Sequence, residues 1–319
     1  MATLGYHCAH EQHPPSELLR LARLAESSGF GAGMCSDHLH PWLPEQGQSG
    51  FSWSWLGSAL EATGLSFGTV CAPGDRYHPA MVAQASATLA QMYPGRFWVS
   101  LASGEALNEH VTGAPWPAKP QRNARLRECV ELIRALWRGE VVDHDGLVTV
   151  RRARLYTTPA EPPPIVAAAL TEETARWAGG WADALVTVAA EPDALRRVVD
   201  AFREGGGEGK PLFLQVALSY ADTDDEALRN AWREWRQAGL GPAQLADLPT
   251  PEAFAEACRD VSPEALRERL RISSEPARFV DWLARDAELG FERIFLHNLG
   301  RNQEAFIEAF AARVLPALR

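Results

Sequence analysis

The feature that most constrains the fold of this chain is an alternation of short apolar runs with amphipathic helical stretches. Residues 4–8 form the first apolar run, and leucines and alanines at helical spacing follow it up to Ser28. The pattern recurs along all 319 residues. Eight strands are predicted in this way, over 4–8, 31–35, 65–71, 96–102, 165–169, 184–188, 212–219 and 293–297.

Eight strand–helix units joined by right-handed crossovers favour an α/β fold of the (β/α)8 barrel type. The rival is an open doubly wound sheet, which usually has a glycine-rich turn after its first strand. Residues 7–15 (HCAHEQHPP) do not form such a turn. Three segments interrupt the repeat: a loop over 40–51, a hairpin over 141–156, and a polar helical insertion over 222–271 at the barrel mouth. None of them resembles a flexible linker, so we expect one domain over 1–319.

The charge balance argues against nucleic acid as a partner. Lys and Arg total 31 against 41 Asp and Glu, a formal net charge of −10, whereas nucleic-acid-binding proteins carry basic patches. No 18 apolar residues run together, so no membrane span is predicted, and the first residues lack the pattern of a secretory signal. The five cysteines are widely spaced, without a CxxC pair, which is typical of a reducing compartment. We therefore expect a soluble cytoplasmic protein that binds neither nucleic acid nor membrane.

Polar side chains gather where the predicted strands end. The carboxyl ends of barrel strands meet on one rim, and active sites form there. The set suits proton transfer beside an aromatic cofactor. Its members are Asp37, His38, Trp42, Glu105, Asn108, His297 and Asn298. Further residues at the same strand ends are predicted to contact the cofactor, namely Cys71, Ala72, Ser103, Gly104, Ala169 and Leu170.

Several of these residues also have a purely structural account. His38 can be a loop residue hydrogen-bonded to Asp37, and Glu105 can cap the helix that follows it. Trp42 can serve packing alone in a chain with 11 tryptophans, and His297 can be a satisfied residue of the barrel wall. At this point both accounts stay open.

Anion binding has a separate candidate. Thr171 and Thr174 fall in the first turn of a predicted helix, where free N–H groups and the helix dipole favour a phosphate. An ordinary N-cap role for Thr171 is an equally good account. No metal site is expected, because the spacing of His7, His10 and His13 matches no known ligand set.

Several stretches resemble the luciferase-like superfamily of flavin- and deazaflavin-dependent oxidoreductases. The Ser-Asp-His sequence at 36–38 with Trp42, the RYHPA stretch at 76–80, and GEALNE at 104–109 resemble its branch of F420-dependent sugar-6-phosphate dehydrogenases. The resemblance is close over roughly residues 4–140 and can be traced to the end of the chain. It implies a barrel with an insertion in its seventh unit, usually a homodimer, that holds a flavin-type ring at the carboxyl ends of the strands.

The resemblance also implies roles for individual residues. Asp37 would contact the cofactor, and His38 would be the base that takes a hydroxyl proton. Trp42 would stabilise the reacting centre, and Glu105 would act as the acid.

Further cofactor contacts follow from the same resemblance. Asn108 matches a cofactor-contacting position, and Thr171 and Thr174 match the site of the cofactor phosphate. A cis peptide bond that does not involve proline is expected within residues 69–72.

Two departures from the pattern bear on the substrate. Where the sugar-phosphate enzymes carry lysines for the substrate phosphate, the matching positions here are Glu191 and, in the insertion, Glu256. Carboxylates there would repel a phosphorylated sugar. Glucose 6-phosphate is therefore not expected to be the substrate.

The chain is most similar to a sub-branch suspected of using FMN, so the leading expectation is an FMN-dependent oxidoreductase. It would act on a small organic molecule by hydride transfer at the flavin N5 or by oxygen-coupled monooxygenation, with a flavin reductase as a possible partner. One alternative is the same fold using coenzyme F420 on an unphosphorylated substrate. Another is a non-catalytic flavin-binding protein, which would not need His38, Trp42 and Glu105 together.

Overall fold

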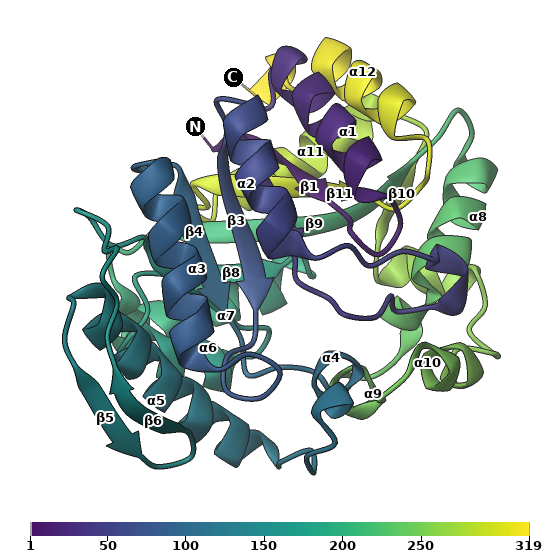
Figure 1. Cartoon of the computed structure of the whole chain (residues 1–319). Helices are drawn as coiled ribbons and strands as arrows, with labels where there is room; N and C mark the ends of the chain where they lie inside the picture. Colours follow the sequence, from purple (N-terminus) through teal and green to yellow (C-terminus); the bar gives the residue numbers. More distant parts are fainter. Residues whose placement is uncertain (1, 319) are drawn as a thin grey trace.

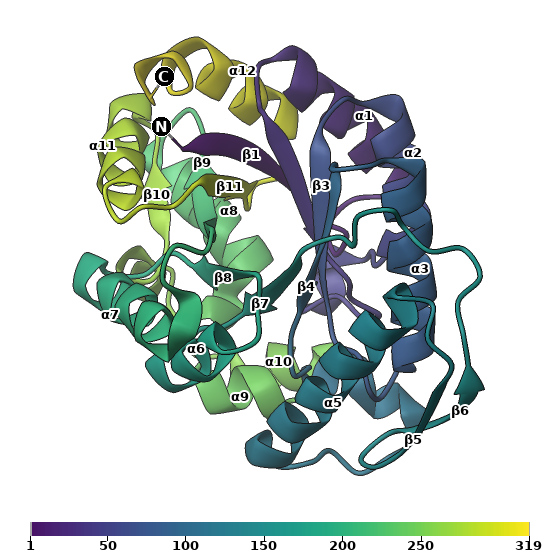
Figure 2. The same ribbon diagram turned by 90° about the vertical axis from the view of Figure 1, so that its left-hand side faces the viewer.

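Eight parallel strands close into a barrel in the computed structural model, which describes residues 2–318 (Figures 1 and 2). Going round the barrel from β1, each strand pairs with the next in the order β1, β2, β3, β4, β7, β8, β9 and β11, and β11 pairs back with β1. The predicted (β/α)8 fold is confirmed. The barrel strands are β1 (Thr3–Cys8), β2 (Ala32–Ser36), β3 (Ser66–Cys71), β4 (Phe97–Leu101), β7 (Ile165–Ala168), β8 (Ala184–Val188), β9 (Leu212–Tyr220) and β11 (Arg293–Asn298).

Helices cover the outside of the barrel, and the carboxyl ends of the strands open at the bottom of Figure 1, where α4 (Ala106–Glu109) lies. Both chain ends lie at the opposite end of the barrel (Figure 1). The covering helices are α1 (Pro15–Ser27), α2 (Ser52–Ala62), α3 (Pro79–Met92), α5 (Lys119–Trp137), α6 (Glu172–Gly179), α7 (Pro192–Phe202), α11 (Pro276–Ala287) and α12 (Gln303–Arg313). Short helical turns lie at Pro44–Gln46, His110–Thr112, Arg203–Gly207, Arg236–Gly239, Glu264–Glu268 and Pro316–Leu318.

One covering helix, α2, has no counterpart among the predicted elements. Its buried residues recur at helical spacing, but the helix contains three serines, a glycine and a single charged residue, Glu61. Such a helix shows little contrast between an apolar and a polar face, and that contrast is what sequence periodicity detects.

The expected hairpin and insertion are both present. β5 (Val142–Asp145) and β6 (Thr149–Ala153) form the antiparallel hairpin around Gly146. The insertion consists of α8 (Asp224–Trp235), α9 (Pro242–Asp247), α10 (Pro251–Ala257) and the short strand β10 (Arg271–Ser273). β10 pairs with β9 outside the closed barrel. α9 and α10 lie beside α4 at the carboxyl end of the strands (Figure 1).

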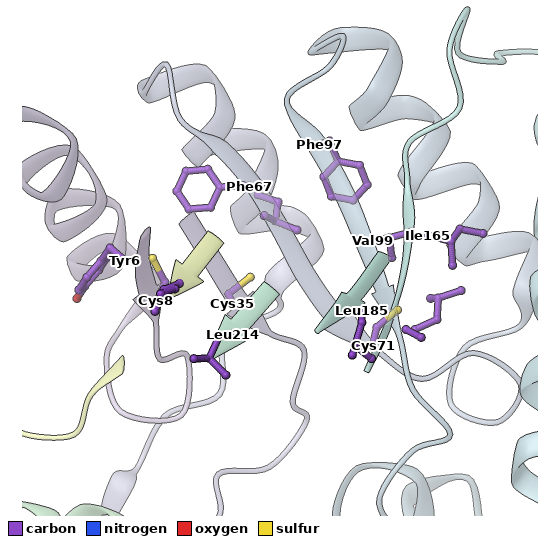
Figure 3. Close-up of a cluster of buried hydrophobic side chains, with 14 of the residues drawn as sticks. Tyr6, Cys8, Cys35, Phe67, Cys71, Phe97, Val99, Ile165, Leu185 and Leu214 are labelled. Atoms are coloured by element: carbon purple, nitrogen blue, oxygen red, sulfur yellow. The ribbon is translucent and has the colours of Figure 1, made fainter. Parts of the chain in front are cut away.

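The core has two layers. Inside the barrel, the Trp98 ring packs against Phe213 and Phe295, with ring centroids 5.2 and 5.6 Å away. The Trp98 ring also requires glycine at position 68 on the neighbouring strand, because a Cβ there would lie 2.1 Å from the indole. A larger layer between strands and helices contains residues such as Tyr6, Cys35 and Phe67 (Figure 3), and its burial is the main stabilising term of the fold.

All peptide bonds among residues 2–318 are trans. The cis peptide bond expected within residues 69–72 is therefore not present in this structure. No helix in the same range is both long and apolar enough to cross a membrane.

Candidate active site

His38 lies between two carboxyl groups at the carboxyl end of the barrel. Its Nε2 atom is 3.6 Å from Oε1 of Glu11 and 3.9 Å from Oε2 of Glu105. The three residues follow β2, β1 and β4, so three strand ends meet here. The Trp42 ring packs beside His38, with 5.1 Å between ring centroids. The structure thus brings together His38, Trp42 and Glu105, and it adds Glu11.

Burial sets the protonation states of this group. Desolvation, with a smaller contribution from the charge of Arg76, lowers the pKa of His38 to about 3, so the imidazole is neutral at pH 7. Desolvation raises the pKa of Glu11 to about 7 and that of Glu105 to about 8, with repulsion between the two carboxylates adding to the rise at Glu105. The Glu105 side chain is nevertheless 37% exposed, so it can be reached from the carboxyl end of the barrel. A neutral imidazole and a protonated carboxyl group therefore stand side by side at neutral pH.

Asp37 is held in a buried ion pair beside this group. The Ser52 hydroxyl donates to its Oδ1 atom at 2.8 Å, and Nη2 of Arg76 donates to its Oδ2 atom at 2.9 Å. Arg76 also pairs with Glu109, with 3.6 Å between Nε and Oε1. Both carboxylate oxygens of Asp37 thus bind protein groups, and the contact with a cofactor stays a prediction.

The loop after β2 is fixed from two sides. Oδ1 of Asn108 accepts a hydrogen bond from the backbone N–H of Leu39 at 2.9 Å, so this predicted cofactor residue also positions the loop. Trp42 packs edge-on against Phe254 and Trp235, with centroids 5.2 and 6.3 Å apart. Both partners belong to the insertion, which therefore contacts the mouth of the barrel here.

Small residues line another part of the mouth. Ala72, Ser103 and Gly104 all keep accessible surface. Gly104 has φ +85°, and a Cβ on it would lie 3.3 Å from the Cβ of Ala72, so backbone and methyl group are in close approach. Nζ of Lys119 donates to Oγ of Ser103 at 2.7 Å, which places a cation beside these small residues.

The first turn of α6 has the predicted N-cap. Oγ1 of Thr171 accepts from the backbone N–H of Thr174 at 3.3 Å and donates to its Oγ1 at 3.0 Å. Desolvation, with a smaller effect of the Arg122 charge, lowers the pKa of Lys119, and the charges of Glu105 and of Glu173 in this turn oppose that effect. The predicted positions nearby differ in exposure: Cys71 and Ala169 are buried, and Leu170 is 61% exposed.

The sequence matches the luciferase-like monooxygenase family over residues 2–293. The chain belongs to this family. The F420-dependent glucose-6-phosphate dehydrogenase of Nakamurella multipartita is 35% identical to it, over 99% of this chain and 96% of that protein. Membership makes the protein an oxidoreductase, as predicted.

Two solved structures are also similar to this chain. An F420-dependent secondary alcohol dehydrogenase, solved with an F420–acetone adduct, is 32% identical and superposes with a TM-score of 0.92 over 100% of both chains. The oxygenating constituent of 3,6-diketocamphane monooxygenase from Pseudomonas putida, solved with FMN, is 17% identical and has a TM-score of 0.72 over 99% of each chain. At that identity, the second likeness shows the shared fold alone.

Sequence reasoning missed three functional candidates of this luciferase-like oxidoreductase. Glu11 stands three residues after β1, and the strand-end rule could have found it. Arg76 lies in a stretch that carries the family resemblance, but its pairing with Asp37 depends on the fold. Lys119 carries no recognisable pattern, because its neighbours in space come from other elements.

The two carboxylates expected to repel a phosphate lie at the surface of the protein. Glu191 and Glu256 are both exposed, and Glu256 forms an ion pair with Arg259. Solvent and the partner charge screen their effect. The predicted repulsion of phosphorylated sugars by these two residues is therefore weak, and any discrimination has to come from elsewhere in the site.

Proposed function

We propose that this luciferase-like oxidoreductase is a coenzyme F420-dependent dehydrogenase that oxidises an alcohol group of a small organic substrate. The observation that carries the proposal is the neutral His38 imidazole between the carboxyl groups of Glu11 and Glu105. The choice of cofactor is supported by relatives of 32–35% identity over the whole chain that are F420-dependent dehydrogenases.

The residues of the mouth fit a planar cofactor with a phosphate-bearing side chain. Ala72, Ser103 and Gly104 are small and accessible, which leaves room for a ring system. Lys119 and the N-terminus of α6 offer a cation and backbone N–H groups to a phosphate. When bound, coenzyme F420 accepts a hydride, so the protein has to supply positioning and proton transfer.

The substrate hydroxyl proton has a suitable acceptor in His38. Nδ1 of His38 lies 3.3 Å from the backbone oxygen of His40, so we assign the ring proton to Nδ1. Nε2 then has a free lone pair, and it is the nitrogen that faces Glu11 and Glu105. His38 takes the proton of the substrate hydroxyl. Glu105 holds its own proton below about pH 8 and can donate it to a molecule bound beside it at the carboxyl end of the barrel.

FMN, the leading expectation from the sequence, has weaker support. The FMN-containing neighbour is 17% identical and shares only the fold. An F420-dependent dehydrogenase takes its hydride from the substrate and needs no flavin reductase as partner. The homodimer stays a prediction under either cofactor.

Separate titrations of the purified protein with coenzyme F420 and with FMN, followed by quenching of cofactor fluorescence, test the cofactor. Saturable binding of F420 without binding of FMN is the expected result, and the reverse would refute the choice. The reconstituted protein is then mixed with 2-propanol, glycerol, glucose or glucose 6-phosphate, and the visible absorbance of F420 is followed. No reduction with any alcohol, at a concentration where F420 is bound, would rule out the dehydrogenase.

A further inference from the structure

Several buried side chains at the carboxyl end of the barrel have polar atoms without a protein partner, and three of these atoms bear on substrate binding. They are Nδ1 of His7, Nδ1 of His297 and Oε2 of Glu11, and each of the three residues is at most 2% exposed. His7 on β1 and His297 on the adjacent strand β11 have ring centroids 4.5 Å apart. Buried polar groups in native proteins are almost always hydrogen-bonded, so unfilled ones point to water or a ligand.

The hydrogen-bond roles at His297 follow from its neighbours. The Gln12 side chain donates through Nε2 to the backbone oxygen of Leu299 at 2.9 Å and to Oε2 of Glu234 at 3.2 Å, which fixes Oε1 as its acceptor end. Nε2 of His297 lies 3.3 Å from that oxygen and therefore donates to it. Because burial keeps the imidazole neutral, the unpartnered Nδ1 of His297 is a hydrogen-bond acceptor.

The two imidazoles of this histidine pair are uncharged at neutral pH. Burial lowers the pKa values of His7 and His297, and the histidines around them, including His10 and His38, lower that of His7 further. Two cations near the mouth are engaged, since Arg76 pairs with Asp37 and Glu109 and Arg301 pairs with Glu234. A third, Lys119, lies beside Ser103 on the side proposed for the cofactor phosphate. A phosphate placed at this pair would find hydrogen-bond acceptors, because the described contacts of His7 and His297 include no Lys or Arg.

An aromatic wall stands next to the pair. The Trp235 ring packs edge-on against His297, with centroids 4.7 Å apart, and Trp42 lies 6.3 Å from Trp235. Both tryptophans keep part of their surface accessible. A polar floor of neutral imidazoles with an apolar aromatic wall suits a molecule that has hydroxyl groups on one edge and C–H groups on its face.

We propose that His7 and His297 form a hydroxyl-binding subsite that selects an uncharged polyhydroxylated substrate, such as a free sugar, over its phosphorylated form. The inference rests on the proposed function in one respect, because it assumes that the hydroxyl to be oxidised lies at His38. The two tryptophans link the two positions, since Trp42 packs against His38 and Trp235 packs against His297.

Calorimetric titration with glycerol, D-glucose and D-glucose 6-phosphate tests the subsite, with the protein free and with saturating F420. We expect glucose to bind at least fivefold more tightly than glucose 6-phosphate in at least one of these two states. His7→Phe should weaken glucose binding at least fivefold without lowering the melting temperature, because it removes a buried polar atom that has no protein partner. His297→Gln, which keeps a polar group beside Gln12, should weaken glucose binding in the same direction.

Tyr6→Phe is the matched control, since Tyr6 neighbours His7 on β1 and its hydroxyl donates to Gln303 instead. It should leave glucose binding unchanged even though it removes a buried hydrogen bond. Tighter binding of glucose 6-phosphate, absence of binding by either neutral probe, or unchanged glucose affinity in both histidine variants would overturn the subsite. Glucose binding that depends on His7, without reduction of F420, would leave the subsite standing and refute the proposed dehydrogenase.

Discussion

The two sides of the barrel mouth treat their polar groups differently. At the ends of β1, β2 and β11 these groups are buried, and Nδ1 of His7, Nδ1 of His297 and Oε2 of Glu11 have no protein partner. At the ends of β7 and β8 the residues are largely exposed, and the hydroxyl groups of Thr171 and Thr174 bind each other. Unfilled buried groups reduce stability, so they are expected where a bound molecule completes them.

From this contrast we expect the buried side to carry out the reaction and the exposed side to hold the cofactor. Desolvation shifts the pKa values of His38, Glu11 and Glu105 on the buried side. Exposed groups on the other side stay close to water and can exchange it for a phosphate at little cost. Substitutions on the buried side should therefore change turnover, and substitutions on the exposed side should change cofactor affinity.

The largest effect is expected for His38→Asn. It removes the proton acceptor, so kcat should fall about 10²–10⁴-fold, the usual contribution of a general base. The dissociation constant for F420, measured by fluorescence quenching, should change little. If the variant keeps its turnover but loses F420 binding, the buried side holds the cofactor, and the expected division between the two sides is wrong.

Arg76→Met should give the largest loss of stability. It leaves Asp37 and Glu109 buried without their cation, which typically costs about 3–5 kcal/mol of unfolding free energy, measured by urea denaturation. Arg197→Met is the control from the exposed side, where Arg197 pairs with Glu172 in solvent. Removing that pair should cost about 0–1 kcal/mol. Equal losses in the two variants would contradict the contrast.

The pH dependence of turnover should reflect Glu105. Its pKa is raised to about 8, so the group is protonated at neutral pH and loses its proton as the pH rises through that value. If its proton is required, kcat falls up to about tenfold per pH unit above pH 8. His38 stays neutral throughout this range, because its pKa is about 3.

Glu105→Gln tests the assignment of that alkaline limb. Glutamine keeps a donor but cannot titrate, so the variant should be slower and its rate should no longer fall above pH 8. An alkaline limb that persists at the same pH in the variant would assign the titration to another group.

The barrel could be predicted from the sequence because it depends on local periodicity, whereas the charge state of the site could not. Strand ends alone selected His38 and Glu105, and the family resemblance gave them their roles. The shifted pKa values arise from burial among β1, β2 and β4, which no single segment encodes. The sequence likewise does not tell that Glu191 is exposed, so that solvent screens its predicted repulsion of a phosphate.

Helix α2 and the pair of His7 and His297 are two further features that could not be predicted from the sequence. α2 contains three serines, a glycine and only one charged residue, so its outward face contrasts little with its buried face and the periodicity that identifies helices is weak. His7 and His297 are 290 residues apart in the chain, and only the closure of β11 onto β1 makes them neighbours. Near His7 in the sequence a pattern search finds only His10 and His13, and their spacing matches no known metal site.

The smallest effect is expected for Thr171→Ala on the exposed side. Loss of this N-cap should cost about 0.5–2 kcal/mol of stability. If the N-terminus of α6 also binds the cofactor phosphate, F420 affinity should fall about fivefold, which corresponds to ~1 kcal/mol. Thr223→Ala is the matched control, because Thr223 caps α8 in the same way by accepting from the N–H of Glu226 at 3.2 Å. The control should lose similar stability and keep its F420 affinity. Equal cofactor affinity in both variants would mean that Thr171 is only a cap, and that the anchoring of the cofactor depends on Lys119 and the backbone around Gly104.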